Sequence, residues 1–403
     1  MQTSIPGVVM LDDLDRLMEI AGIDAIVAEG SAFEVPDIFW MTGFRSTDSI
    51  ICFKSRNEPQ VIAAGFNTLD RIRSQSFVKH THDLTELYVS LMRENKRAQE
   101  NPEIIYRDVL KNLFTGKVLG VPDHIPARVL VAVQKLGYDV RVMPDLLKEA
   151  RARKSGAEIK TIRKAGDATI ESMTEAFQMI RDSKVGPNKI LIHKGQPLTV
   201  GDFKLKLELA LVTRSAESAE DAIVDVGKKG FDWHYLGAPR DVMKAGEPII
   251  IDVFPRLKLD RYVADITRTV VKGPMSDRVK TMYDAVDEAK AAAVDTLTDG
   301  AVIDDVNMAC FKSLKAHGFD SRRLNPTATE GMTHGLGHGI GLEVHENPNM
   351  YHYTEKFSEG HVITLEPGVY LRSTGGVRLE DDYVVTKGKA KLLTRGLDDV
   401  ALL

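Results

Sequence analysis

The sequence GMTHGLGHGIGLEVHE at residues 331–346 places three histidines, His334, His338 and His345, in one short segment. Four glycines lie between the first and the last of them, and glycine allows backbone and side chains to approach a compact centre closely. A single histidine is commonly a structural residue, but three in one glycine-rich segment indicate a functional site. A fourth histidine, His234, lies in the same half of the chain.

Two acidic residues in this half end apolar, strand-like runs. Asp252 follows three consecutive isoleucines, and Glu366 follows residues 362–365 and precedes Pro367-Gly368. A carboxylate at the end of a buried strand is costly unless it is paired with a cation or coordinated to a metal. Both positions therefore need a positive partner.

Two further acids lie in strand-like stretches with other polar residues. The alternation of side chains along a strand predicts that Asp265, Thr267 and Thr269 share one face. Arg378 and Glu380 share a face in the same way. We expect Asp265 to lie on a strand that covers residues 261–271.

Two kinds of cation could neutralise these acids. For any one acid, pairing with Arg268 or Arg378 and coordination of a metal are equal alternatives. Four acids and one imidazole are harder to balance with two arginines, whereas two divalent ions match four carboxylates in charge. Mixed carboxylate and imidazole ligands suit Mn, Fe, Co or Zn rather than Mg alone.

Composition limits the class of protein. The chain has 403 residues, of which 43% are hydrophobic and 28% charged, so we expect two folded domains. The net charge is −5, which disfavours nucleic acid as a partner, and no apolar run approaches the roughly 20 residues that cross a membrane. Residues 1–11 show no secretion signal, and the distant pair Cys52 and Cys310 forms no disulfide framework, so we expect a cytoplasmic protein.

Hydrophobic patterning divides the chain near residue 150. Residues 1–150 alternate short helical and strand patterns, which predicts a small α/β domain. Residues 151–403 combine long helices with separate strands, which predicts an α+β domain. Strands are expected at residues 24–28, 49–53, 60–64, 117–121 and 139–142, and then at 222–226, 248–254, 261–271, 361–370 and 377–385; helices are expected at 11–21, 158–181, 277–297 and 304–316.

These motifs resemble the pita-bread metallopeptidases, a family that includes methionine aminopeptidase, aminopeptidase P, prolidase and creatinase. The resemblance spans most of the chain and implies an α/β creatinase/prolidase-like N-terminal domain at 1–150, followed by an α+β pita-bread (creatinase/aminopeptidase) catalytic domain at 151–403. The N-terminal domain places the chain in the prolidase, aminopeptidase P and creatinase branch, nearest to Xaa-Pro dipeptidase. The residues that carry the resemblance are Asp252, Asp265-x-Thr267-Arg268-Thr269, Gly337-His338-Gly339-x-Gly341, Val344-His345-Glu346, Glu366-Pro367-Gly368 and Arg378-x-Glu380.

The resemblance also implies a role for each matching residue. Asp252 would bind one metal ion, Asp265 and Glu380 would bridge two ions, and His338 and Glu366 would bind the other. The two divalent ions are expected to be Mn, with Co, Zn or Fe as alternatives.

Further roles concern the reaction itself. Glu366 would also move the proton of the attacking water, and His345 and His234 would hydrogen-bond the substrate carbonyl and the developing charge. His334 is either a participant or a wall of the pocket.

The spacing between the first two acids departs from the family pattern. The family usually has eleven residues between them, whereas the hairpin from Asp252 to Asp265 is longer here. Asp260 lies inside this hairpin and is an alternative ligand, but Asp252 ends the apolar strand, so we favour Asp252.

The implied substrate is a small peptide with proline in its second position, and the implied reaction is hydrolysis of an Xaa-Pro dipeptide. A dipeptidase needs a cation for the terminal carboxylate, and Arg378 and Arg372 are candidates for a bidentate grip. Alternatives are an Xaa-Pro aminopeptidase of the aminopeptidase P type, a creatinase-like hydrolase or lyase, and a non-catalytic peptide-binding relative. The family resemblance further implies a homodimer. The acidic pair Asp381-Asp382 is expected to cap a strand or face solvent.

Overall fold

The computed structural model describes residues 11–397 and 401–403. The expectation that residues 1–11 carry no secretion signal therefore falls almost entirely outside the described residues. The chain forms two compact units, residues 1–151 and 152–403. None of the described helices is long and apolar enough to cross a membrane.

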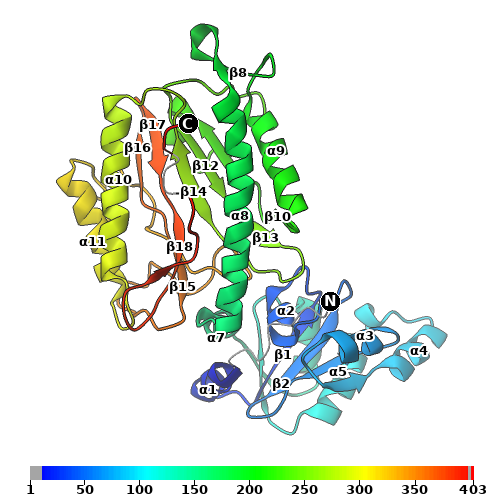
Figure 1. The fold of residues 1–403 in the computed structure, drawn as a ribbon. Helices are drawn as coiled ribbons and strands as arrows, with labels where there is room; N and C mark the ends of the chain where they lie inside the picture. Colours follow the sequence, from blue (N-terminus) through cyan, green and yellow to red (C-terminus); the bar gives the residue numbers. More distant parts are fainter. Residues whose placement is uncertain (1–10, 398–400) are drawn as a thin grey trace. The chain divides into compact units, whose positions relative to one another are not determined.

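The first unit contains a six-stranded mixed sheet with the strand order β4-β3-β2-β1-β5-β6 (Figure 1). The central strand β1 pairs with β2 antiparallel and with β5 parallel. Helices α5 and α6 pack against the sheet through a core that includes Val27, Phe53, Val109 and Val133. The elements are α1 (Leu11–Ala21), β1 (Ala25–Gly30), α2 (Pro36–Thr42), β2 (Ile50–Ser55), β3 (Val61–Ala64), α3 (Thr68–Gln75), β4 (His80–Asp83), α4 (Thr85–Arg93), α5 (Pro102–Leu113), β5 (Val118–Val121), α6 (Ala127–Lys135), β6 (Asp139–Val142) and α7 (Leu146–Ala152).

The second unit is built around short antiparallel sheets with two pairs of long helices. Figure 1 shows α10 and α11 on one side of these strands and α8 and α9 on the other. The helices are α8 (Gly156–Asp182), α9 (Val200–Thr213), α10 (Asp277–Thr296) and α11 (Ile303–Ala316). The strands are β7 (Lys184–Val185), β8 (Leu191–His193), β9 (Gln196–Pro197), β10 (Ala216–Ser218), β11 (Ile223–Val226), β12 (Ile249–Val253), β13 (Pro255–Leu257), β14 (Ile266–Val270), β15 (Val362–Leu365), β16 (Gly368–Leu371), β17 (Gly375–Arg378), β18 (Asp381–Val384) and β19 (Lys391–Leu392).

Each helix pair has its own hydrophobic core. Phe177 of α8 and Phe203 of α9 pack with Ile251 of the β11-β12-β14 sheet. In the other half, Met282 of α10 packs with Ile363 of β15. The helices therefore support the strands from outside, and the polar residues of the strands remain available between the two halves.

Three of the strands expected from the sequence are interrupted or shorter than predicted. The stretch 361–370 forms β15 and β16, which pair with different partners, because Pro367 has no N–H to continue the ladder. The stretch 377–385 forms β17 and β18, with Glu380 between them. Asp265 lies one residue before β14 rather than within a strand. The acids Asp265, Glu366 and Glu380 therefore lie directly beside strand ends.

The glycine-rich segment 331–346 forms neither a helix nor a ladder strand. Gly337 packs so tightly that an added Cβ would lie 2.1 Å from the carbonyl oxygen of Thr364. At Gly339 an added Cβ would lie 2.4 Å from the backbone of Asn347. The expected close backbone approach is confirmed at both positions, and it fixes the backbone on both sides of His338.

We predict that Gly337→Ala lowers the free energy of unfolding by about 3 kcal/mol, at the upper end of overpacking costs, because backbone rather than a flexible side chain occupies the space. Gly156→Ala is the matched control: an added Cβ there meets nothing within 4 Å, and the residue begins α8. That variant should equal the wild type or gain up to about 1 kcal/mol. Urea unfolding measures both, and equal stability of the Gly337 variant and the wild type would contradict the tight packing.

Candidate metal centre

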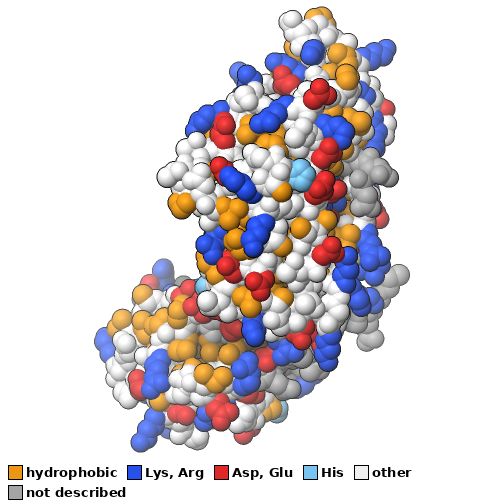
Figure 2. Space-filling model, turned by 90° about the vertical axis from the view of Figure 1, so that its left-hand side faces the viewer, with side chains coloured by type: hydrophobic (Ala, Val, Ile, Leu, Met, Phe, Trp, Pro, Cys, Tyr) orange, Lys and Arg blue, Asp and Glu red, His pale blue; other side chains and the backbone are white. Residues whose placement is uncertain are grey.

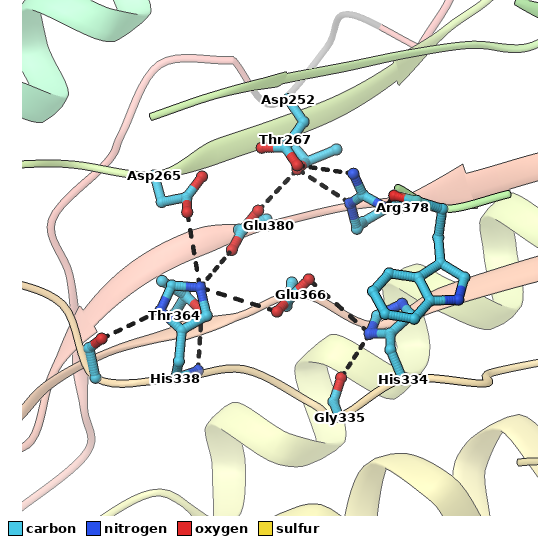
Figure 3. A network of polar contacts seen from close by, with 12 residues as sticks. Asp252, Asp265, Thr267, His334, Gly335, His338, Thr364, Glu366, Arg378 and Glu380 are labelled. Carbon is cyan, nitrogen blue, oxygen red and sulfur yellow. Dashed lines mark hydrogen bonds and ion pairs between the residues drawn. The ribbon is translucent and has the colours of Figure 1, made fainter. Parts of the chain in front are cut away.

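All five side chains proposed as metal ligands line one cavity of about 520 Å³ in the second unit. They come from distant stretches of sequence: Asp252 lies within β12, Asp265 precedes β14, and Glu366 and Glu380 follow β15 and β17. His338 comes from the glycine-rich segment. Figure 3 shows the five side chains directed toward one another.

The tightest part of the cluster surrounds the His338 ring. Its Nε2 atom lies 3.7 Å from Oδ2 of Asp265, 3.9 Å from Oε1 of Glu366 and 4.0 Å from Oε1 of Glu380. Asp265, His338 and Glu380 each offer a ligand atom within 4.8 Å of the others. The space between them has the dimensions of a cation site.

Several carboxylate oxygens in this cluster are buried and make no hydrogen bond with the described residues. They are Oδ1 of Asp252, Oδ1 of Asp265 and Oε1 of Glu380. An unpaired buried carboxylate oxygen is costly, and a divalent cation would satisfy several at once. The donor set of four carboxylates and one imidazole therefore fits divalent metal ions.

Burial also alters the acidity of these groups. Burial raises the pKa of Glu366 to about 8, with Asp252 adding to the rise and Arg378 opposing it. Burial and the neighbouring carboxylates raise the pKa of Asp265 and of Glu380 well above the ordinary range. Without a metal, the cluster therefore holds protons that a bound cation would displace.

Arg378 connects the cluster to the cavity wall. It is 2% exposed, and its Nη2 donates to Oδ2 of Asp252 at 2.7 Å. Nη1 donates to the Tyr370 hydroxyl at 2.9 Å and to the Trp233 carbonyl oxygen at 3.3 Å, and Nε donates to Thr267 at 3.3 Å. Four of its five N–H groups are thus engaged, so the expected bidentate grip on a substrate carboxylate is corrected: at most one N–H remains for a ligand.

The structure does not bring Arg372 to the cavity. Its side chain is exposed, and its guanidinium lies over the Phe231 ring at 4.3 Å, where a cation–π contact holds it. Asp260 is also outside the cavity lining and pairs with Lys164 at 2.7 Å. Of the two aspartates in the hairpin, Asp252 is therefore the one that reaches the cavity.

The other three histidines line the same cavity. His334 binds the Gly335 carbonyl oxygen through Nδ1 at 2.7 Å and the Tyr370 hydroxyl through Nε2 at 2.9 Å. A carbonyl can only accept, so Nδ1 carries the proton and Nε2 accepts from the tyrosine. Burial lowers the pKa of His334 to about 3, so this ring is neutral.

His345 and His234 each lie against another aromatic ring of the cavity lining. The His345 ring lies 4.2 Å from the His338 ring, centroid to centroid, and the His234 ring lies 3.6 Å from that of Trp233. Burial lowers the pKa of His234. Both rings are placed to meet a ligand in the cavity.

A layer of polar contacts behind the cluster positions its members. Thr267 donates to Oε2 of Glu380 at 2.7 Å, and the backbone N–H of His338 donates to the Thr364 hydroxyl at 3.2 Å. The backbone N–H of Asp265 donates to Oδ2 of Asp382 at 3.1 Å.

Asp381 and Asp382 begin β18 and are both buried, so the alternative that they face solvent is wrong. Asp381 pairs with Arg268 at 2.8 Å and with Lys290 at 2.7 Å. Arg268 pairs with Asp381 and also donates to the backbone carbonyl oxygen of Glu380 at 2.7 Å.

Asp225 is a buried acid that the sequence analysis did not single out. It is 1% exposed, neither carboxylate oxygen has a hydrogen-bond partner among the described residues, and burial raises its pKa to about 8. In the β11–β12 ladder Ile223 lies opposite Asp252, so Asp225 falls on the same face as that ligand candidate. Strand alternation could have identified it, since it interrupts an apolar stretch.

Comparison with known proteins identifies the class. The model of metallopeptidase family M24 matches residues 160–387, and the chain belongs to this family. The expectations of a pita-bread fold and of a metal-dependent hydrolase are thereby confirmed.

Individual relatives agree with this assignment. The chain is 29% identical over 283 residues to the Xaa-Pro dipeptidase of Pyrococcus horikoshii, covering 69% of this chain and 73% of the relative. It is 29% identical over 259 residues to the Xaa-Pro dipeptidase of Pyrococcus furiosus, covering 64% and 67%.

Solved structures resemble nearly the whole chain. The prolidase from Pyrococcus horikoshii OT3 matches with a TM-score of 0.76 at 23% identity, covering 97% of this chain and 99% of that one. The X-Pro aminopeptidase from Thermotoga maritima matches with a TM-score of 0.77 at 22% identity, covering 96% and 100%. These likenesses establish the fold.

The raised acid pKa values predict how the metal-free protein responds to pH. The folded chain holds protons on Glu366 and Asp225 up to about pH 8, whereas the unfolded chain releases them near its ordinary values, so stability should fall as the pH rises. Between about pH 7 and about pH 8 the histidines are nearly neutral in both states, and Glu366 and Asp225 together give an expected loss of about 2 kcal/mol, roughly 1 kcal/mol each.

Urea unfolding in the presence of a chelator measures this loss. Glu366→Gln should reduce the pH dependence, and restoring a divalent cation should remove most of it, since the cation favours the ionised carboxylates. An unfolding free energy that increases over this range in the chelated protein would contradict the account.

Proposed function

We propose that this protein is an Xaa-Pro dipeptidase that hydrolyses the peptide bond before proline. The observation that carries the proposal is the convergence of Asp252, Asp265, His338, Glu366 and Glu380 around unpartnered, buried oxygens in one cavity. The two Pyrococcus relatives named as Xaa-Pro dipeptidases support the substrate class.

The five side chains would hold two divalent ions, for which we propose Mn. Asp252 would serve one ion and His338 and Glu366 the other, with Asp265 and Glu380 shared. Bound ions of this kind lower the pKa of a coordinated water and polarise a carbonyl group. The orphaned oxygens of Asp252, Asp265 and Glu380 supply the negative charge that such ions require.

The chain's own residues would position the substrate and move the proton. Glu366 would accept the proton of the attacking water and deliver it to the proline nitrogen as the carbon–nitrogen bond breaks. His345 and His234, which line the cavity, would hydrogen-bond the substrate carbonyl and the charge that develops on it. His334 would remain neutral and shape the pocket, since both ring nitrogens are engaged.

An Xaa-Pro aminopeptidase is the second candidate function. The match to the aminopeptidase from Thermotoga maritima favours it, because that structure resembles the chain as closely as the prolidase does. The commitment of Arg378 to protein partners also leaves the terminal carboxylate of a dipeptide without a bidentate cation.

We further propose a catalytic domain at residues 151–403, an N-terminal domain at 1–150 and a cytoplasmic homodimer. Cys52 and Cys310 are buried free thiols, which is compatible with a reducing compartment. On the face turned to the viewer in Figure 2, Lys and Arg side chains are interspersed with Asp and Glu, which supports the proposal that nucleic acid is not a partner.

Parallel assays test the proposed function. The chelated protein, reloaded with Mn, Co or Zn, is given Met-Pro and a Met-Pro-Ala tripeptide, and we expect turnover of the dipeptide alone. Glu366→Gln should reduce kcat by at least about a hundredfold, because it can no longer carry the proton.

Turnover of both peptides would assign the aminopeptidase instead. Turnover of neither peptide by protein that has bound metal would contradict both and favour a lyase.

A further inference from the structure

Two carboxylates lie on the cavity wall away from the metal-ligand cluster. Glu220 and Asp221 belong to the loop between β10 and β11, and both line the cavity. Lys204 pairs with Asp221 at 2.9 Å from outside the lining, whereas Glu220 makes no ion pair or hydrogen bond with a described residue. Glu220 is exposed and therefore presents to the cavity a negative charge that no described protein group pairs with.

The Arg or Lys side chain that lines the cavity already has an acidic partner. Arg378 is the one Arg or Lys among the described lining residues, and it is paired with Asp252. The deep end of the same cavity holds the 6%-exposed Asp252, whose Oδ1 has no hydrogen-bond partner among the described residues. The acids of the loop thus share one cavity with the candidate metal centre.

The path of the chain limits how far the loop that carries Glu220 and Asp221 can lie from Asp252. Ile223 lies opposite Asp252 in the ladder, and the Ala219 N–H donates to the Phe254 carbonyl oxygen at 3.4 Å, so the loop continues alongside β12. Asp221 precedes Ile223 by two residues and lies at most about 7 Å beyond it along the chain. The stem of an extended lysine spans about 6 Å from Cα to Nζ.

The wall near these acids and the cluster is apolar. Ile223, Leu236 and Phe254 line the cavity beside the acids. Lysine and arginine bury an aliphatic stem along such a surface while keeping the charged end at a polar edge. A first residue of this type, with its amino group near the cluster, would place its cation beside Glu220.

We propose that Glu220 makes this cavity select a basic first residue, so that Lys-Pro and Arg-Pro are preferred substrates. The inference rests on the proposed Xaa-Pro peptidase function and specifies its substrate class. Glu220 acts on specificity, since it lies away from the reacting bond.

The test is kcat/KM for Lys-Pro, Met-Pro and Glu-Pro with the full-length, Mn-loaded protein. We expect Lys-Pro to exceed Met-Pro by about fivefold and Glu-Pro to fall below Met-Pro by a similar factor, the range of a partly exposed ion pair. Added salt should reduce the Lys-Pro advantage.

Glu220→Gln keeps the size of the side chain and removes its charge, and it should bring the Lys-Pro to Met-Pro ratio close to one. Glu217→Gln is the matched control, because Glu217 lies on β10, pairs with Arg261 and does not line the cavity, so its ratio should match the wild type. A merely structural role for Glu220 would change both substrates equally and leave the ratio intact.

Three results would overturn the inference. Turnover of Met-Pro at least equal to that of Lys-Pro in the wild type, or an unchanged ratio in Glu220→Gln, refutes the basic preference and leaves the peptidase function standing. If the protein hydrolyses none of the Xaa-Pro peptides, the peptidase function is refuted, and the inference that rests on it is refuted too.

Discussion

The burial of several carboxylates around one cavity is the constraint on which the rest of this site depends. Asp252, Asp265 and Glu380 are each less than 10% exposed, and each keeps an oxygen without a hydrogen-bond partner among the described residues. Burial disfavours the charged form of a carboxylate, and like charges nearby repel it, so both effects raise the pKa of Asp265 and of Glu380. Divalent cations would neutralise these carboxylates. The arrangement is therefore costly without metal and favourable when metal is bound.

The fold places Asp265, Glu366 and Glu380 beside interruptions in its strands, whereas Asp252 lies within the β12 ladder. A residue within a ladder has its backbone fixed by both neighbours, whereas a residue directly beyond a strand end can turn its side chain toward the centre. Glu366 precedes Pro367, which stops the ladder, and Glu380 lies between β17 and β18. The helices outside supply the hydrophobic cores, and Gly337 and Gly339 allow the His338 backbone to approach the strands.

Local pattern in the sequence was sufficient to predict the residues that meet in the cavity. Asp252 and Glu366 end apolar runs, and three histidines are concentrated in one glycine-rich segment. These residues can therefore be identified as candidates without tertiary information. The roles of the arginines could not be predicted in this way. Arg378 pairs with Asp252, one of the alternatives that the sequence left open, but it also donates to the Trp233 carbonyl and the Tyr370 hydroxyl of distant segments. Arg268 pairs with Asp381, which the sequence did not indicate. Arg372 shows the same limit, because its contact with Phe231 arises only from the folded chain.

Anomalous diffraction from crystals grown with Mn measures directly whether the five side chains hold two metal ions. The account predicts two Mn peaks about 4 Å apart, with Asp265 and Glu380 contacting both, Asp252 contacting one, and His338 and Glu366 contacting the other. Well-ordered crystals with no peak in the cavity, or with these carboxylates satisfied by protein groups alone, would contradict it.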